Sequence, residues 1–375
     1  MENLNKKIIF SANSSWYLSN FRSSTLKKFI DEGYEVTCLA PKDGSTNALQ
    51  NLGCKFIDLK MDNKGKNFIK DLKLIYSFYH AYRLIDPFAV FNFTIKNNIY
   101  GAYAASLTRT RVFSHITGLG TAIIHRGLTA LTVKLMYKTS QLFAKAVFCQ
   151  NFDDSQFFIT NGLIPKKKIK ILPGSGVDLQ HYSQATKIPI KNKAGSDLLI
   201  FLYAGRVLKD KGLIELVEAV RLINLDKVVC KLKIHGFTNN KNLSSISVNE
   251  IKSWEKIPGI EWCGATNNMK KILGKVDCVV LPSYREGMPR SLLEAAAMSL
   301  PLIASNVPGC REIVLNNING ILCNPKDHID LQRAMQQMIN FTPSQRSIMG
   351  EAGRKLVEQQ FDERIVINAA LSAVR

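Results

Sequence analysis

The sequence has no hydrophobic run near the ~18 residues that a membrane-spanning helix needs, and none of its eight cysteines forms a Cys-x-x-Cys pair. The first absence argues against an integral membrane protein, and from the polar start of the chain, Met1 to Lys7, we expect no secretory signal. Scattered cysteines are typical of reduced thiols in a cytoplasmic protein and form no metal-ligand pattern. Acidic residues are scarce, because 30 Asp and Glu face 50 Lys and Arg, a net charge of +20.

The basic excess is concentrated in the first half, where residues 1–172 hold 24 Lys and Arg against 11 Asp and Glu. Nucleic acid, anionic lipid and a phosphorylated substrate are the possible acidic partners. In two segments, 68–76 and 128–144, lysines stand among apolar residues at helical spacing, which is typical of helices on an anionic membrane surface. The pattern fits equally well with core-facing helices whose lysines reach into water. No basic stripe with interleaved aromatic residues is present, so we expect no nucleic-acid partner.

Short apolar segments alternate with helical patterns along the chain. The first series places strands at 7–11, 35–40, 54–59, 90–94, 111–117 and 146–149, and the second at 198–205, 230–236, 260–264, 278–281 and 302–304. After the first strand we expect a polar loop and then a helix over about 20–31. This alternation predicts an α/β fold with two Rossmann-like domains, each a doubly wound parallel sheet, facing a cleft.

A Pro and Gly cluster at 173–176 marks the expected boundary between the domains. The first domain is expected over 1–172 and the second over 173–355. Residues 356–375 are expected to form a C-terminal helix that packs back on the first domain.

Two glutamates eight positions apart are the most informative feature. Glu286 lies in a Gly/Pro loop after the apolar strand 278–281, and Glu294 lies one turn into a helix expected to start at Pro289. A loop and a helix N-terminus offer N–H groups and a positive dipole end to a phosphate. With two carboxylates nearby, this layout suits a ligand with phosphate and hydroxyl groups, such as a nucleotide sugar. The alternative is that Glu286 caps the helix and Glu294 is a solvated helix residue.

This segment resembles the E-x7-E motif of retaining glycosyltransferases of the GT-B fold, family 4. Other motifs stand in the family's order: 201–212 upstream, with a Gly-Arg and a Lys-Gly pair, and 301–314 downstream, which ends in Gly-x-x-Glu and precedes 319–322. The resemblance covers about 165–361. It implies the GT-B architecture, with an acceptor-binding first domain and a nucleotide-sugar-binding second domain.

The resemblance also implies roles for single residues in donor binding. Arg206 and Lys211 contact the donor diphosphate, and Glu294 binds the ribose hydroxyls. Glu286 helps to hold the sugar, so Glu286, Arg206 and Lys211 are the candidate catalytic residues. The remaining candidates for the donor site are Gly287, Met288, Pro289, Arg290, Thr117 and Gly118.

The first domain departs from the family pattern at one position. Many members have a histidine directly before a glycine-containing loop, where this chain has Thr117, and His115 stands two residues earlier. A related subgroup also lacks that histidine, keeps a Gly-Leu-Gly loop and extends sugars on undecaprenyl diphosphate, especially by α-1,3 addition of N-acetylgalactosamine. His115 fits a core position as well as a functional one, and Trp16 fits simple packing as well as sugar binding. The candidate acceptor-binding residues are Asn13, Ser14, Trp16, Phe21, Arg22 and His115.

The implied activity is retaining transfer of a sugar, with N-acetylgalactosamine as the first choice among N-acetylhexosamines. The expected donor is a UDP-sugar, and the expected acceptor is a polyprenyl-diphosphate-linked saccharide in bacterial surface polysaccharide or glycan assembly. The chain has no Asp-x-Asp pair, so no metal or other cofactor is expected. The expected location is the cytoplasm, peripheral on the anionic inner membrane. The alternatives are a UDP-sugar epimerase of the same fold and a transferase acting on lipopolysaccharide core.

Overall fold

The structure is a computed structural model and describes residues 6–62, 67–120, 123, 127–183, 198–238 and 244–375. The chain divides into two compact units. Unit 1 comprises Met1–Ser175 and Arg364–Arg375, and unit 2 comprises Gly176–Glu363. The division therefore falls inside the Pro and Gly cluster at 173–176.

Unit 1 is built on a seven-stranded parallel sheet with the strand order β3-β2-β1-β4-β5-β6-β7. The chain moves outward from β1 through β3, returns to the centre at β4 and then moves outward on the other side. The strands are β1 (Lys7–Ser11), β2 (Glu35–Ala40), β3 (Lys55–Asp58), β4 (Ala89–Phe93), β5 (Arg111–Ile116), β6 (Ala146–Cys149) and β7 (Ile169–Ile171). The helices are α1 (Ser15–Asp31), α2 (Thr46–Asn51), α3 (Phe68–Ile85), α4 (Ile95–Thr108), α6 (Leu128–Ser140), α7 (Phe152–Thr160), the short 3-10 helix η1 (Lys166–Lys168) and α14 (Glu363–Val374).

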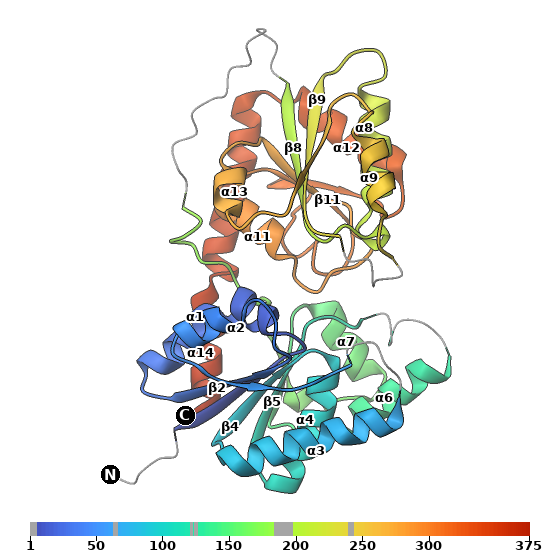
Figure 1. Ribbon diagram of the computed structural model, residues 1–375. Coiled ribbons are helices and arrows are strands. Elements are labelled where there is room, and N and C mark those ends of the chain that lie inside the picture. Colours follow the sequence, from blue (N-terminus) through green and yellow to red (C-terminus); the bar gives the residue numbers. More distant parts are fainter. Residues whose placement is uncertain (1–5, 63–66, 121–122, 124–126, 184–197, 239–243) are drawn as a thin grey trace. The chain divides into compact units, whose positions relative to one another are not determined.

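Helices cover both faces of this sheet because side chains alternate between the faces along each strand. Ile9, Val90 and Val112 pack in one cluster with residues of α3, α4, α6 and α7. Ile8 and Phe10 pack in another with residues of α1, α2 and α14. Figure 1 shows α14 beside α1 and the α3–α4–α6 layer on the other side of the sheet. The C-terminal helix thus completes the core of unit 1.

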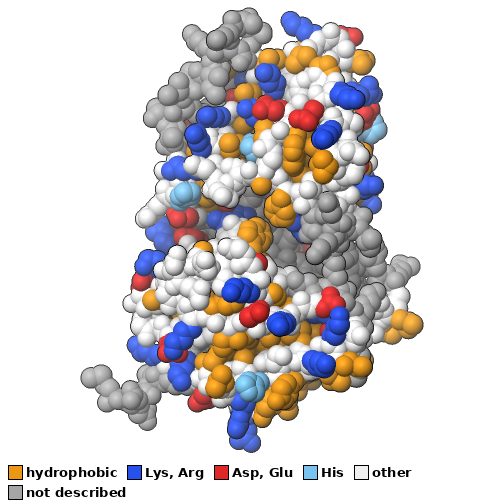
Figure 2. Space-filling view, viewed as in Figure 1, with side chains coloured by type: hydrophobic (Ala, Val, Ile, Leu, Met, Phe, Trp, Pro, Cys, Tyr) orange, Lys and Arg blue, Asp and Glu red, His pale blue; other side chains and the backbone are white. Residues whose placement is uncertain are grey.

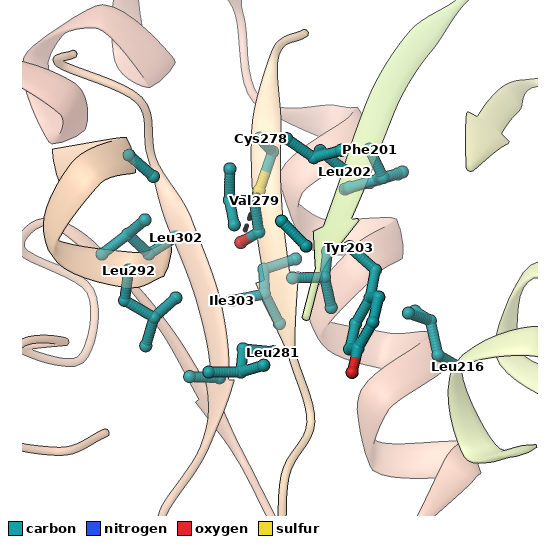
Figure 3. Close-up of a cluster of buried hydrophobic side chains, with 14 of the residues drawn as sticks. Phe201, Leu202, Tyr203, Leu216, Cys278, Val279, Leu281, Leu292, Leu302 and Ile303 are labelled. Carbon is teal, nitrogen blue, oxygen red and sulfur yellow. Dashed lines mark hydrogen bonds between the residues drawn. The ribbon is translucent and has the colours of Figure 1, made fainter. Parts of the chain in front are cut away.

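Unit 2 repeats the same plan with a six-stranded parallel sheet in the order β10-β9-β8-β11-β12-β13. Figure 3 shows buried side chains of two neighbouring central strands, Phe201 to Tyr203 and Cys278 to Leu281, with Leu292 on one side of the sheet and Leu216, near Tyr203, on the other. The strands are β8 (Leu199–Ala204), β9 (Cys230–His235), β10 (Ile260–Gly264), β11 (Cys278–Leu281), β12 (Leu302–Ser305) and β13 (Gly320–Cys323). The helices are η2 (Lys209–Lys211), α8 (Leu213–Ile223), α9 (Val248–Trp254), α10 (Met269–Leu273), α11 (Arg290–Ala297), α12 (His328–Asn340) and α13 (Pro343–Gln360). The prediction of two doubly wound parallel sheets is confirmed.

The prediction of a polar loop between β1 and a helix at about residue 20 is wrong. The helix α1 already begins at Ser15, because the Oγ of Ser14 accepts a hydrogen bond from the backbone N–H of Tyr17 at 3.1 Å and caps it. The start of α11 differs by one residue: Pro289 is the extended N-cap, and the helix begins at Arg290. Among the described helices, none is long and apolar enough to cross a bilayer.

Candidate active site

The two central strands of unit 2, β8 and β11, lie side by side, and the chain leaves them toward opposite edges of the sheet. Ligands of doubly wound folds bind outside the carboxyl ends of the strands at such a switch point. The segments that follow these two strands are 205–212 and 282–289. They carry the predicted donor residues Arg206, Lys211 and Glu286.

Lys211 and Glu286 form an ion pair that joins the two loops. The Nζ of Lys211 lies 2.5 Å from the Oε1 of Glu286, and each side chain is 13% exposed. The hydroxyl of Ser283 donates to the same oxygen at 2.7 Å. The Glu286 carboxylate is therefore oriented by two donors beside the carboxyl ends of β8 and β11.

Gly212 explains why the loops come so close. Its backbone has a φ of +70°, and a Cβ added there would lie 2.0 Å from the carbonyl oxygen of Pro282. Only glycine tolerates both the left-handed conformation and this approach. The glycine next to Lys211 thus fixes the distance across which the lysine meets Glu286.

Arg206 follows β8 in an exposed position, and its side chain makes no ion pair within the described chain. Its carbonyl oxygen accepts a 2.7 Å hydrogen bond from the hydroxyl of Tyr203, which is buried in the core. Burial raises the pKa of Tyr203 well above its ordinary value, Glu286 raises it further, and Arg206 lowers it. Arg206 and Glu286 therefore act on the same buried hydroxyl, and Arg206 offers a second cation near the Lys211–Glu286 pair.

Glu294 lies in α11 and is largely buried. Burial raises its pKa above the ordinary value, and the neighbouring Arg290 opposes this rise. The Nε of Arg290 lies 2.8 Å from the Oε1 of Glu294, and Tyr182 also hydrogen-bonds the carboxyl group. Arg354 of α13 holds Tyr182 in place by donating to its carbonyl at 2.8 Å and to that of Ala297 at 2.7 Å.

The loop after β12 packs against the backbone of Glu286 and Gly287. A Cβ at Gly309 would lie 2.5 Å from the carbonyl oxygen of Gly287, and Gly309 has a φ of +80°. Cys310 is buried, and its pKa is raised well above the ordinary value by burial and then by the nearby Glu286. The sequence motif around Gly309 thus has a structural basis: it packs against the Glu286–Gly287 backbone.

In unit 1 the expected acceptor residues after β1 lie on α1 and its cap. Trp16 is 42% exposed and packs edge-on against Phe21, with ring centroids 5.5 Å apart. Arg22 is only 2% exposed, and its guanidinium lies 4.5 Å from the centre of the Phe93 ring. Both terminal nitrogens of Arg22 donate to the carbonyl of Gly174 at 3.4 Å. Ser14 is the helix cap, and Asn13 lies in the short turn that precedes it.

His115 ends up packed in the core of unit 1. Its ring lies 4.5 Å from that of Phe93 and 4.7 Å from that of Phe148. Burial lowers the pKa of His115 well below its ordinary value, and the positive charge of Arg22 lowers it further. His115 is therefore a neutral imidazole, as expected of a core histidine. Thr117 and Gly118 follow at the carboxyl end of β5, both partly exposed.

Sequence reasoning missed the contributions of Ser283, Tyr203, Tyr182 and Arg354. The first adjoins a named motif, and a hydroxyl beside a buried carboxylate could have been suspected. Tyr203 lies within the motif at 201–212, while Tyr182 and Arg354 act through folding contacts that have no sequence signal. Within the described residues, no three His, Cys, Asp or Glu side chains cluster as a metal-ligand set.

Comparison with known families agrees with this geometry. The family described as "Glycosyl transferases group 1" matches residues 184–356, and the one described as "Glycosyl transferase 4-like" matches residues 7–151. The chain belongs to these glycosyl transferases. The family resemblance inferred from the motifs is confirmed.

Two curated relatives are informative. The chain is 26% identical over 371 residues to the N,N'-diacetylbacillosaminyl-diphospho-undecaprenol alpha-1,3-N-acetylgalactosaminyltransferase of Campylobacter jejuni, covering 96% of each protein. It is 27% identical over 269 residues to the UDP-Gal:alpha-D-GlcNAc-diphosphoundecaprenol alpha-1,3-galactosyltransferase of Escherichia coli, covering 70% of this chain and 68% of that one. Both relatives extend sugars on diphospho-undecaprenol.

A solved structure supports the fold. The crystal structure of Anabaena Alr3699/HepE in complex with UDP matches with a TM-score of 0.79 and 17% identity, covering 98% of both chains. The two-sheet architecture of this chain is thus shared with that protein.

Proposed function

We propose that this glycosyl transferase moves an N-acetylhexosamine, N-acetylgalactosamine first, from a UDP-sugar to a saccharide linked to polyprenyl diphosphate. The observation that carries the proposal is the Lys211–Glu286 pair at the switch point of unit 2, next to Arg206. The two relatives that act on diphospho-undecaprenol sugars support the acceptor class. The product would belong to bacterial surface polysaccharide or glycan assembly, and the enzyme would work peripherally on the cytoplasmic face of the inner membrane.

In the proposed reaction the bond between the sugar anomeric carbon and the UDP oxygen breaks. A bond from the acceptor hydroxyl oxygen forms on the same face, which retains the configuration. The acceptor proton passes to the departing phosphate oxygen, so that the products are UDP and the extended saccharide. This chain's part is to meet the charge that develops on the diphosphate, without a metal ion.

Lys211 and Arg206 are the groups assigned to that charge. An ammonium has three donors, so the contact with Glu286 leaves Lys211 able to bind a phosphate oxygen as well. Glu286, held by Lys211 and Ser283, accepts from a sugar hydroxyl, while Glu294 accepts from the ribose hydroxyls. The buried position of Glu294 favours a hydroxyl partner, because a bound hydroxyl makes up for part of the lost hydration of the carboxylate.

The test is UDP release from a panel of UDP-sugars, with and without a polyprenyl-diphosphate-linked saccharide. We expect release that depends on the acceptor, is fastest with a UDP-N-acetylhexosamine and gives an α-linked product from an α-linked donor. Turnover of the UDP-sugar without an acceptor, accompanied by inversion at a sugar carbon, would instead establish an epimerase. Transfer to lipopolysaccharide core alone would establish the other alternative.

A further inference from the structure

The exposed hydrophobic side chains of unit 1 are distributed unevenly. Among the described residues of this unit, 14 large hydrophobic side chains are exposed, and ten of them lie on α3, α4, α6 or the turn after α6. From the opposite helix layer, the described residues with such exposed side chains include only Trp16 on α1 and Ile365 on α14. In Figure 2 orange and blue side chains are interspersed over the region where Figure 1 draws α3 and α6. One helix layer of this unit is therefore far more apolar on its outside than the other.

The outward positions on two of these helices form stripes. Ile69, Leu72 and Tyr76 recur at spacings of three and four residues along α3, as neighbours on one side of a helix do. Leu128, Leu131 and Leu135 do the same along α6. These six side chains, here called the leucine edge, are between 49% and 84% exposed.

Both stripes lie at the edge of the sheet where ligands bind. In a parallel sheet each connecting helix begins at the carboxyl edge of the strands and runs back toward the amino edge. The leucine edge occupies the first turns of α3 and α6, after β3 and β5. Both helices pack against α4. Lys96 of α4 forms an ion pair with Asp71 of α3, and the hydroxyl of Tyr103 of α4 donates to the carbonyl of Met136 of α6. The three helices therefore form one layer, and the outer sides of α3 and α6 face away from the sheet in the same direction.

The segment of the chain that carries the leucine edge has a positive net charge. Residues 67–145 contain ten Lys and Arg and two Asp. Lys73 and Lys138 are exposed beside the two stripes. Leucines that enter a lipid interface and lysines that meet anionic headgroups are the two components of reversible membrane binding.

We propose that the leucine edge docks unit 1 on an anionic lipid bilayer. The apolar side chains enter the interface while the neighbouring lysines bind the headgroups. Docking by the carboxyl edge would bring the candidate acceptor residues, which follow β1 and β5, close to the membrane surface. The proposal rests on the proposed function in one respect: this orientation serves catalysis only if the acceptor is linked to a lipid.

The experiment measures co-sedimentation of the full chain with vesicles of phosphatidylglycerol and phosphatidylethanolamine, and with vesicles of phosphatidylcholine alone. The test variant is Leu131→Glu with Leu135→Glu. The matched control is Leu84→Glu with Leu107→Glu, two residues that are equally exposed on the same helix layer but lie at the C-terminal ends of α3 and α4. Both variants replace exposed leucines, so thermal unfolding should match the wild type.

We expect the wild type to bind the anionic vesicles and to bind phosphatidylcholine much less. The test variant should bind the anionic vesicles roughly a hundredfold more weakly. It lacks two leucines that would be buried in the lipid interface, and its two new glutamates are repelled by the negative headgroups. The control variant should stay within about threefold of the wild type, since such a difference is under 1 kcal/mol. Equal loss in both variants would overturn docking by this edge, and so would wild-type binding by the test variant.

A second measurement separates this proposal from the proposed function. With an acceptor whose lipid is short enough to dissolve in water, the test variant should turn over at the wild-type rate. If no variant transfers sugar but vesicle binding follows the pattern above, docking stands and the proposed function fails. A dimer that the test variant converts to a monomer, with vesicle binding unchanged, would show that a second copy of the chain covers the leucine edge.

Discussion

In unit 2 four candidate residues form two ion pairs, one between the loops at the switch point and one on α11. In unit 1, by contrast, Arg22 and His115 are packed against aromatic rings. Lys211 meets Glu286 and Arg290 meets Glu294, each cation holding a carboxylate. In unit 1, Arg22 has no carboxylate partner among the described residues: its guanidinium lies on Phe93 and donates to a backbone carbonyl. Two sheets of the same plan thus present different chemistry at the same edge.

The difference shows which unit is prepared for charge. In an ion pair beside the ends of the strands, the cation can bind a phosphate of a ligand and the carboxylate can accept from a hydroxyl of the ligand. This arrangement suits a nucleotide-sugar donor. Unit 1 instead combines a buried cation, aromatic side chains and an apolar outer edge. That combination suits an acceptor with a sugar and a lipid. The following predictions test this contrast between the two units.

The largest effect is expected at the ion pair of unit 2. Lys211→Ala removes a charged contact to the diphosphate and leaves Glu286 without its cation, which should lower kcat/KM roughly a hundredfold. Lys209→Ala is the matched control, because Lys209 is an exposed lysine in the same turn, and it should change little. Steady-state kinetics with a saturating acceptor measure both. Equal effects in the two variants would mean that general positive charge, and not the pair, is what matters.

The two glutamates should differ in which kinetic constant they change. Glu286→Gln should lower kcat, because the sugar moves in the transition state, while Glu294→Gln should raise the KM for the donor, because the ribose does not move. Each loss of a charged hydrogen bond should amount to about ten- to a hundredfold. Varying the donor at fixed acceptor separates the two constants. The reverse pattern would show that the donor binds the other way round.

In unit 1 we expect His115→Phe to affect stability and not transfer. Phe keeps the stacking on Phe93 and Phe148, so activity should stay within about threefold. Because the folded pKa of His115 lies well below its ordinary value of 6.5, the unfolded chain binds a proton first as the pH falls. The wild type should therefore lose stability relative to the variant by about 1.4 kcal/mol per pH unit below 6.5. Denaturant titrations at neutral and acid pH measure this, and a large loss of turnover would instead assign His115 to the site.

The smallest effect is expected from chelation. If the cations of unit 2 stabilise the diphosphate without a metal ion, EDTA should leave the rate within about twofold. Complete loss of activity, restored by Mn²⁺ or Mg²⁺, would contradict the role given to Lys211 and Arg206. If added metal does not restore the activity, the assay is repeated after EDTA is removed, which shows whether EDTA itself inhibits the enzyme.

All of the described strands except β7 and β13 were predicted from the sequence, because they are short apolar runs bounded by Gly, Pro or charge. The strands β7 and β13 were missed. The strand over 35–40 agrees with β2 residue for residue. The start of α1 was missed because the polar run after β1 resembles a loop, and only its Ser14 cap turns it into the first turn of a helix.

Within the site, the spacing of Arg290 and Glu294 could have predicted their ion pair, since residues four apart are neighbours on a helix. The contact of Lys211 with Glu286 depends on which two strands are neighbours, so it follows from topology and not from local sequence. The burial of Arg22 and the approach of Tyr182 to Glu294 depend on packing between distant segments, for which a single sequence holds no signal.

The position of α14 at the end of the chain determines when the core of unit 1 can be completed during synthesis. Val366, Ile367 and Leu371 belong to the core of unit 1, although they leave the ribosome after all of unit 2. The face of the sheet that α1 and α2 cover therefore stays incompletely covered until α14 is synthesised. A chain that stops before Arg364 would contain all of unit 2 but lack part of the core of unit 1, so unit 1 can complete its core only after the whole chain has been synthesised.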